Sequence, residues 1–241
     1  MKFGFGLAGL LLCATTVANA DVSDVFPSVS PPSVTHESII ETVYGGDFVA
    51  NGDDYNDGGS GVSAIRFDDS LTPNGMISLL TAGKGDASDR VWSDAFITAK
   101  TVWLRADFTQ QFGFDRGNGF ELLFDAFGEY ENVTGEGSAD LTGETWRWVR
   151  RDQDGTRAWS SDPGQNPDFL DHMVTYQVDG LNRTGVTYLI FIEDLYGSHT
   201  TDGGFSDRDF DDLVIEVHAT PEPATAMLVL GGAMIALRRR R

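Results

Sequence analysis

The chain of 241 residues contains a single cysteine and few basic residues. Cys13 lies in an N-terminal stretch that we expect to be removed, so the remaining chain offers no disulfide, no thiol nucleophile and no thiolate metal ligand. Only 17 Lys and Arg residues oppose 37 Asp and Glu residues, which gives a formal net charge of −20. A field of this sign repels nucleic acid and anionic lipid and favours cations, so we expect no nucleic-acid partner.

Familiar catalytic motifs are also missing. The sequence has no G-x-S-x-G elbow, no H-E-x-x-H helix, no phosphate-binding loop and no dinucleotide fingerprint. With 37 acidic residues, some carboxylate pair will always lie at a spacing that suits glycoside hydrolysis, so such pairs indicate nothing by themselves. We therefore expect a protein that is not an enzyme, and we predict no catalytic residues.

Residues 1–20 have the pattern of a signal peptide. Lys2 precedes an apolar stretch, and the small residues Ala18, Asn19 and Ala20 suit cleavage by signal peptidase. This pattern predicts export. Residues 21–38 are rich in Pro and Ser, which predicts an extended linker before the folded domain.

Residues 39–219 form the predicted domain. The chain has 16 Phe, 5 Trp and 6 Tyr residues, too many aromatics for a disordered protein. Short apolar segments, several of them alternating with period two, are separated by Gly, Asp and Asn clusters. This pattern predicts an all-β fold, namely an antiparallel β-sandwich, for which a jelly roll is one arrangement. The predicted strands are 39–44, 62–67, 101–112, 119–127, 145–151, 172–178, 186–194 and 213–219.

Residues 220–241 differ in character from the domain. Pro221, Glu222 and Pro223 precede an apolar segment, 224–237, and the chain ends in four arginines, Arg238, Arg239, Arg240 and Arg241. As a helix the apolar segment would be roughly 21 Å long, which is short for a membrane span of ~20 residues. Arginines beyond an apolar segment stay in the cytoplasm. We therefore predict a transmembrane helix that halts export and leaves the acidic domain outside.

This order of a Pro-Glu-Pro triplet, a short apolar segment and a terminal arginine cluster resembles the PEP-CTERM sorting signal of exported bacterial proteins. The resemblance covers 220–241, and a signal peptide occurs in the same chain. It implies export in a Gram-negative bacterium, transient anchoring in the inner membrane, and processing by an exosortase near the triplet. It also implies a final location at the cell surface or in the extracellular matrix, associated with exopolysaccharide and biofilm.

Acidic residues gather in 191–217. Glu193 and Asp194 end one predicted strand, and the acids from Asp207 to Asp212 precede the next, so a hairpin would bring them to one end of the sheet. Crowded carboxylates repel one another unless a cation neutralises them, and Ca²⁺ takes about 6 to 8 oxygen ligands. The alternative is a solvated hairpin loop in which Asp and Gly form Asx turns.

The same segment resembles a domain of unknown function that is common in exported PEP-CTERM proteins. The resemblance rests on Glu-Asp-Leu at a strand end, then a loop, then Ser-Asp-x-Asp-Phe-x-Asp before an apolar strand. The position of Asp211 is often Asn in that family, and Asp supplies a further oxygen. With this resemblance, we expect calcium to be the cofactor, and we expect its ligands to be Glu193, Asp194, Asp207, Asp209 and Asp212.

One aromatic and basic stretch, around 145–151, offers a contact for sugar. Trp146, Trp148 and Arg150 share one face of the predicted strand, where indoles flanked by arginine could stack on sugar rings or hold an acidic polysaccharide. The alternative is that the tryptophans fill the core while the arginines pair with nearby acids.

These patterns together predict an exported, non-catalytic surface or matrix protein that is stabilised by calcium. Two alternatives stay open. One is a glycan-binding module for the cell's own polysaccharide, and the other is a polysaccharide hydrolase.

Overall fold

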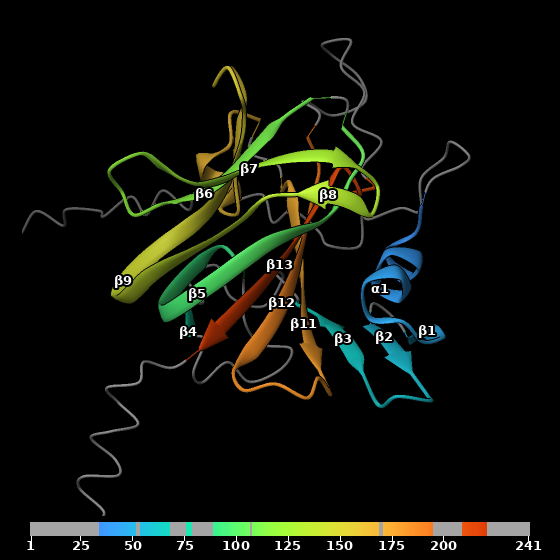
Figure 1. Cartoon of the computed structure of the whole chain (residues 1–241). Coiled ribbons are helices and arrows are strands. Elements are labelled where there is room, and N and C mark those ends of the chain that lie inside the picture. Colours follow the sequence, from blue (N-terminus) through green and yellow to red (C-terminus); the bar gives the residue numbers. More distant parts are fainter. Residues whose placement is uncertain are drawn as a thin grey trace, which may run out of the picture.

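The computed structural model describes residues 34–51, 54–67, 76–78, 89–106, 108–168, 171–194 and 209–220. The predicted signal peptide and sorting triplet, the apolar segment and the arginine cluster lie outside these residues. Within the described part the chain is mostly antiparallel β-sheet with one α-helix (Figure 1). No helix in this part is long and apolar enough to cross a membrane.

The elements follow one another along the chain with short connections in most places. The helices are α1 (His36–Tyr44) and the short 3-10 helix η2 (Pro163–Gln165). The strands are β1 (Phe48–Asn51), β2 (Asp54–Asp57), β3 (Ser63–Arg66), β4 (Met76–Ser78), β5 (Val91–Leu104), β6 (Gln110–Asp115), β7 (Phe120–Glu129), β8 (Asn132–Thr134), β9 (Glu136–Asp152), β10 (Ala158–Ser160), β11 (Met173–Asp179), β12 (Val186–Ile192) and β13 (Leu213–Thr220).

The strands hydrogen bond in the order β1-β2-β3-β11-β12-β13-β5-β9-β6-β7-β8, with β10 beside β9 and β4 beside β5. The pairing of β4 with β5 is parallel, whereas the pairs along the main order are antiparallel. The long strand β9 pairs with β5 along its first part and with β6 along its second. In Figure 1, β13, β12 and β11 therefore lie on one side of β5 and form the first layer with it, and the second layer, with β6, β7 and β8, lies on the other side. This arrangement agrees with the predicted all-β sandwich.

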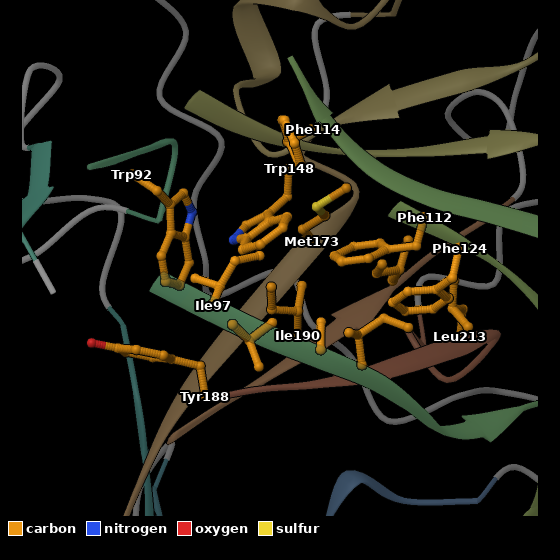
Figure 2. Close-up of a cluster of buried hydrophobic side chains, with 14 of the residues drawn as sticks. Trp92, Ile97, Phe112, Phe114, Phe124, Trp148, Met173, Tyr188, Ile190 and Leu213 are labelled. Carbon is orange, nitrogen blue, oxygen red and sulfur yellow. The ribbon is translucent and has the colours of Figure 1, made fainter. Parts of the chain in front are cut away.

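The larger hydrophobic core lies between these two layers. Figure 2 shows Ile190 and Leu213 meeting Phe112, Phe124 and Trp148 from the other layer. Strand β13 contributes side chains to both faces of its layer, because successive side chains of a strand point to opposite sides. The hydrophobic side chains that meet in this core come mainly from β5, β6, β7, β9, β12 and β13.

A second, smaller core lies on the opposite face of the first layer, under α1. Ile39 and Ile40 of the helix pack there with Val174, Leu189 and Val214 of the sheet. The helix therefore covers a face of the sheet that would otherwise expose apolar side chains, which favours its position on the β11, β12 and β13 strands.

The prediction of a strand at 39–44 is wrong because these residues belong to α1, and the last three residues of the linker predicted at 21–38 belong to the same helix. Residues 36–44 form α1, which begins after Thr35, whose hydroxyl caps the amide of Ser38 at 3.2 Å. The helix ends at Gly45, which has a φ of 69° and donates to the carbonyl of Glu41. The β-branched residues suggested a strand, but the residues that face the sheet, at 36, 39, 40 and 43, have the i, i+3, i+4 spacing of a helix.

The strand predicted at 101–112 is also wrong in part, because it spans two strands. β5 ends at Leu104 and β6 begins at Gln110. The amide of Arg105 still donates to the carbonyl of Asp212, the residue before β13, at 2.9 Å, whereas from Gln110 the chain pairs with β9 instead. The alternating apolar pattern continues past the end of β5 to Phe108, so the sequence pattern did not indicate where β5 ends. The predicted strands at 62–67, 119–127, 145–151, 172–178, 186–194 and 213–219 fall on β3, β7, β9, β11, β12 and β13.

Candidate metal centre

Two neighbouring strands bring acidic residues to one edge of the first layer. β12 ends directly before Glu193 and Asp194, and β13 begins directly after Asp212. Ile192 and Leu213 are partners in the antiparallel register of the two strands. The end of β12 and the start of β13 therefore lie side by side, and the acids that flank them meet.

Three carboxylates form the centre of this arrangement. Glu193, Asp209 and Asp212 each offer one carboxylate oxygen, and these oxygens lie within 4.8 Å of one another. Oxygens that share a Ca²⁺ ion at roughly 2.3–2.6 Å can be at most about 5 Å apart, so one ion could contact all three. Glu193 and Asp209 are buried and Asp212 is half-buried. We call these three residues the carboxylate cluster.

The pKa values of the carboxylate cluster reflect burial and crowded negative charge. Burial, followed by the charges of Glu193 and Asp194, raises the pKa of Asp212 to about 10. Burial and the neighbouring Asp211 raise the pKa of Asp209 to about 6. Asp212 also shares a side-chain hydrogen bond with Glu193. Without a cation, the cluster therefore holds a proton at neutral pH, and a divalent cation could take the place of that proton.

A sharply turned segment presents Asp209 and Asp212 to the cluster. Phe210, between them, has a φ of 55°, in the left-handed region that non-glycine residues rarely adopt. Such a conformation costs about 1–3 kcal/mol and persists only where the surroundings impose it. Here the Phe210 side chain is buried in the smaller core, and that burial offsets the cost.

His36 of α1 holds the same turn from the other side. The carbonyl of Asp209 can only accept, so Nε2 of His36 donates to it at 2.8 Å, and Nδ1 accepts from the hydroxyl of Tyr176 at 2.9 Å. The imidazole stacks on Phe191 with the ring centres 4.1 Å apart. Burial lowers the pKa of His36 to about 4, so the ring is neutral at pH 7. The sequence placed His36 in a linker and carried no sign of this role.

Arg105 balances part of the negative charge near the carboxylate cluster. Its Nη1 lies 3.3 Å from Oδ2 of Asp209 and 3.1 Å from both carboxylate oxygens of Asp211. Asp211 is fully buried, and this ion pair supplies its counter-charge. Sequence reasoning missed Arg105, because it lies more than 100 positions from both acids.

Asp194, another predicted ligand, has a different partner. Its Oδ2 accepts from Nε2 of Gln110 at 3.1 Å and lies 3.5 Å from Nη2 of Arg150. Arg150 is fully buried and also lies 2.7 Å from Asp152. Asp194 therefore stands beside the carboxylate cluster in an ion pair of its own, while its backbone amide donates to Oδ2 of Asp212 at 2.9 Å.

Three of the five predicted ligands, Glu193, Asp209 and Asp212, thus come together. The fifth, Asp207, lies in the segment 195–208, outside the described residues.

The proposed glycan contact around β9 is buried. Trp146 is 1% exposed, and Trp148 and Arg150 are 0% exposed. Trp148 stacks on Phe112 in the larger core with the ring centres 5.1 Å apart (Figure 2). These three residues therefore form no surface for sugar, and the alternative holds in which the indoles fill the core and Arg150 pairs with acids. A period of two shows that the side chains share a face, but it does not show which face points inward.

Two comparisons with known proteins, one with family models and one with curated proteins, find no match. The molecule is thus defined by its own structure, as an all-β protein with a buried carboxylate cluster at one edge of a sheet.

Proposed function

We propose that this chain is an exported, non-catalytic protein of the cell surface or extracellular matrix, and that calcium stabilises its β-sandwich. Export and sorting rest on the signal-peptide pattern and on the PEP-CTERM pattern from Pro221 to Arg241. An exosortase processes the chain after transient anchoring in the inner membrane. A jelly-roll arrangement of the sandwich and an association with exopolysaccharide belong to the same proposal.

The observation that carries the calcium proposal is the carboxylate cluster. Glu193, Asp209 and Asp212 lie within 4.8 Å of one another. Burial of like charges is unfavourable unless a proton or a cation neutralises them. Carboxylate oxygens are hard ligands that suit Ca²⁺, which accepts irregular geometry, better than metals that select nitrogen or sulfur. An ion at this point would join the end of β12 to the segment that leads into β13.

An exported protein meets calcium at high concentration, so a weak site is sufficient. Sites in extracellular modules have dissociation constants on the order of 10⁻⁴–10⁻³ M. A ligand at about 100 times its dissociation constant stabilises the folded state by about 2.7 kcal/mol. For a domain of this size that corresponds to a rise in melting temperature of about 5–10 °C.

Thermal unfolding in calcium and in chelator tests the proposal. We expect the wild type to melt about 5–10 °C higher in calcium, and we expect Asp209→Asn to abolish most of this difference. Glu144→Gln, which removes an exposed acid from β9, is the matched control and should keep the full difference. Equal melting temperatures of the wild type in calcium and chelator would rule out a stabilising calcium site.

Mass spectrometry of the mature protein tests the sorting proposal separately. We expect the surface fraction to lack residues 1–20 and 224–241. A surface fraction that retains 224–241 would contradict processing by an exosortase, whatever the result with calcium.

A further inference from the structure

A polar hollow of about 520 Å³ lies where β13, β5 and β9 run side by side. Its residues alternate along the strands with residues of the larger core, so the hollow is on the outer face of the first layer. The side chains that matter here are Thr98, Lys100, Glu136, Ser138, Arg183 and His218.

The strand register arranges these side chains in rows across the sheet. In one row Lys100 of β5 stands between Glu216 of β13 and Glu136 of β9. In such a row, side chains on the same face of directly paired residues lie about 4.5–5.5 Å apart at Cβ. This row therefore carries alternating charges.

The next row carries neutral polar groups. Thr98 stands between His218 and Ser138. Two residues further along β5, and so on the same face about 7 Å away, Phe96 has a side chain that is 37% exposed. Two hydroxyls and an imidazole thus lie between a charged row and an exposed aromatic ring.

One wall of the hollow is fixed by a buried ion network. Both carboxylate oxygens of Glu216 accept from Arg183, at 3.1 and 3.0 Å, and the hydroxyl of Tyr44 donates to Glu216 at 2.8 Å. Gly185 has a φ of 91°, and a Cβ there would collide with the carbonyl oxygen of Ala219. The glycine therefore allows the turn that carries Arg183 to lie against β13, so the wall is preformed.

The charges around the hollow balance although the chain as a whole does not. Lys100 and Arg183 oppose Glu136 and Glu216, within a protein whose net charge is −20. A polyanion would be repelled by the overall field, and the hollow has no unbalanced cation to hold it. Hydroxyl and imidazole groups can both donate and accept hydrogen bonds, and the ammonium group of Lys100 donates them, which suits an uncharged ligand that carries many hydroxyls.

We propose that this hollow binds an uncharged saccharide chain, with Phe96, beside the hollow, stacking on the apolar face of a sugar ring and Thr98 and Ser138 bonding to its hydroxyls. The inference rests on the exported location proposed above and names a ligand class for that surface role. It is independent of calcium, because Glu193, Asp209 and Asp212 do not line the hollow.

Affinity electrophoresis of the mature chain tests this site. Native gels would contain dextran, galactomannan or hydroxyethyl cellulose as neutral polymers, and alginate as an acidic one. We expect at least one neutral polymer to retard the wild type. We expect Phe96→Ala and Ser138→Trp each to weaken the binding at least about tenfold, which corresponds to the loss of one hydrogen bond or ring contact. The matched control is Phe127→Ala, which removes an even more exposed ring from β7 and should bind like wild type.

Each other outcome overturns the proposal. If no neutral polymer retards the wild type, the hollow is not a site for uncharged saccharide. If only alginate retards it, the ligand class is wrong, and if Phe127→Ala weakens binding as much as Phe96→Ala, the site is elsewhere. Thermal melts confirm that each variant folds.

Repeating the gels in chelator separates this proposal from the calcium proposal. Retardation without a calcium-dependent melting temperature would contradict the calcium site alone. A calcium-dependent melting temperature without retardation would contradict the saccharide site alone.

Discussion

Strand β13 begins beside one carboxylate site, at Asp212, and carries another, at Glu216, and the neighbours of these two carboxyl groups have opposite charges. Asp212, just before the strand, is surrounded by Glu193 and Asp194, and its pKa is raised to about 10. Glu216, within the strand, is also buried, and burial raises its pKa, but hydrogen bonds from Arg183 and Tyr44 and the charge of Lys100 outweigh burial and lower it to about 2. Burial is common to both sites. The sign of the neighbouring charges decides which carboxyl is ionised.

Among the described residues the Glu216 site has its counter-charges, whereas the carboxylate cluster lacks enough of them. Glu216 has its counter-charges within the chain, so it is a structural ion cluster that joins α1, β5 and β13. The carboxylate cluster has Arg105 beside Asp209 but gathers three acids within 4.8 Å. It therefore needs a proton or a metal ion, which is the physical basis of the calcium proposal.

Removal of Arg150 should have the largest effect, because this buried cation pairs with Asp194, which lies beside the carboxylate cluster. Arg150→Met leaves Asp194 and Asp152 without their buried partner. We expect a loss of about 3–5 kcal/mol in the free energy of unfolding, measured with urea. Arg147→Met, on the same strand, removes a cation that is 31% exposed and should cost less than about 1 kcal/mol. Equal losses in the two variants would contradict the role given to Arg150.

Neutralising one acid at each site should shift stability in opposite directions. Glu216→Gln leaves Arg183 and Lys100 without a carboxylate, and since both cations are partly exposed, we expect a loss of about 2–3 kcal/mol. This loss should be the same in calcium and in chelator. In chelator Asp212 must take up a proton on folding at neutral pH, because its pKa is raised to about 10. Asp212→Asn removes the cost of that proton uptake and should gain about 1 kcal/mol in chelator, while losing the stabilisation by calcium. Urea unfolding of both variants in both buffers measures these changes. If the free energy of unfolding changed with the same sign in both variants in chelator, the proposed difference between the two sites would be wrong.

The pH dependence of stability should report the Glu216 site. The pKa of Glu216 is lowered from 4.5 to about 2 in the folded protein. Its contribution is therefore complete above pH 4.5 and is lost as the pH falls from 4.5 toward 2. Between pH 5 and pH 3 we expect Glu216 to account for about 1 kcal/mol, allowing for solvent screening. The difference between wild type and Glu216→Gln should shrink by this amount, and an unchanged difference would show that Glu216 is not held ionised.

The smallest expected effect is that of Tyr44→Phe. This change removes the hydroxyl that donates to Glu216 at 2.8 Å and keeps the ring in place. Arg183 and Lys100 still satisfy the carboxylate, so we expect a loss of about 0.5–1 kcal/mol. Thr42→Val, on the exposed face of α1, is the control, since its hydroxyl bonds only within the helix. A loss no larger than that of the control would show that Tyr44 does not anchor α1 through Glu216.

Much of the sheet could be predicted from the sequence because strand patterns are local. Alternation in 213–219 and the apolar stretch in 186–194 depend on neighbouring residues, and both fall on strands of the structure. The meeting of Glu193 with Asp209 and Asp212 followed from the same pattern, because adjacent antiparallel strands bring the end of one to the start of the next.

The residues that complete the two sites could not be predicted, because their partners are distant in the sequence. Tyr44 and Glu216 are 172 positions apart, and His36 and Asp209 are 173 apart. The helix at 36–44 was missed because its β-branched residues favoured a strand, while its cap residues lie just outside the predicted segment.

Local periodicity and composition were enough to predict that the described chain is mainly β-sheet and that acids gather at the start of β13. Only the tertiary structure decided that Trp146 and Trp148 face the core, that Asp194 pairs with Arg150, and that Glu216 is neutralised while the carboxylate cluster is not. The physical reason is that burial and charge pairing are properties of distant segments brought into contact, and a local pattern does not contain the identity of those partners.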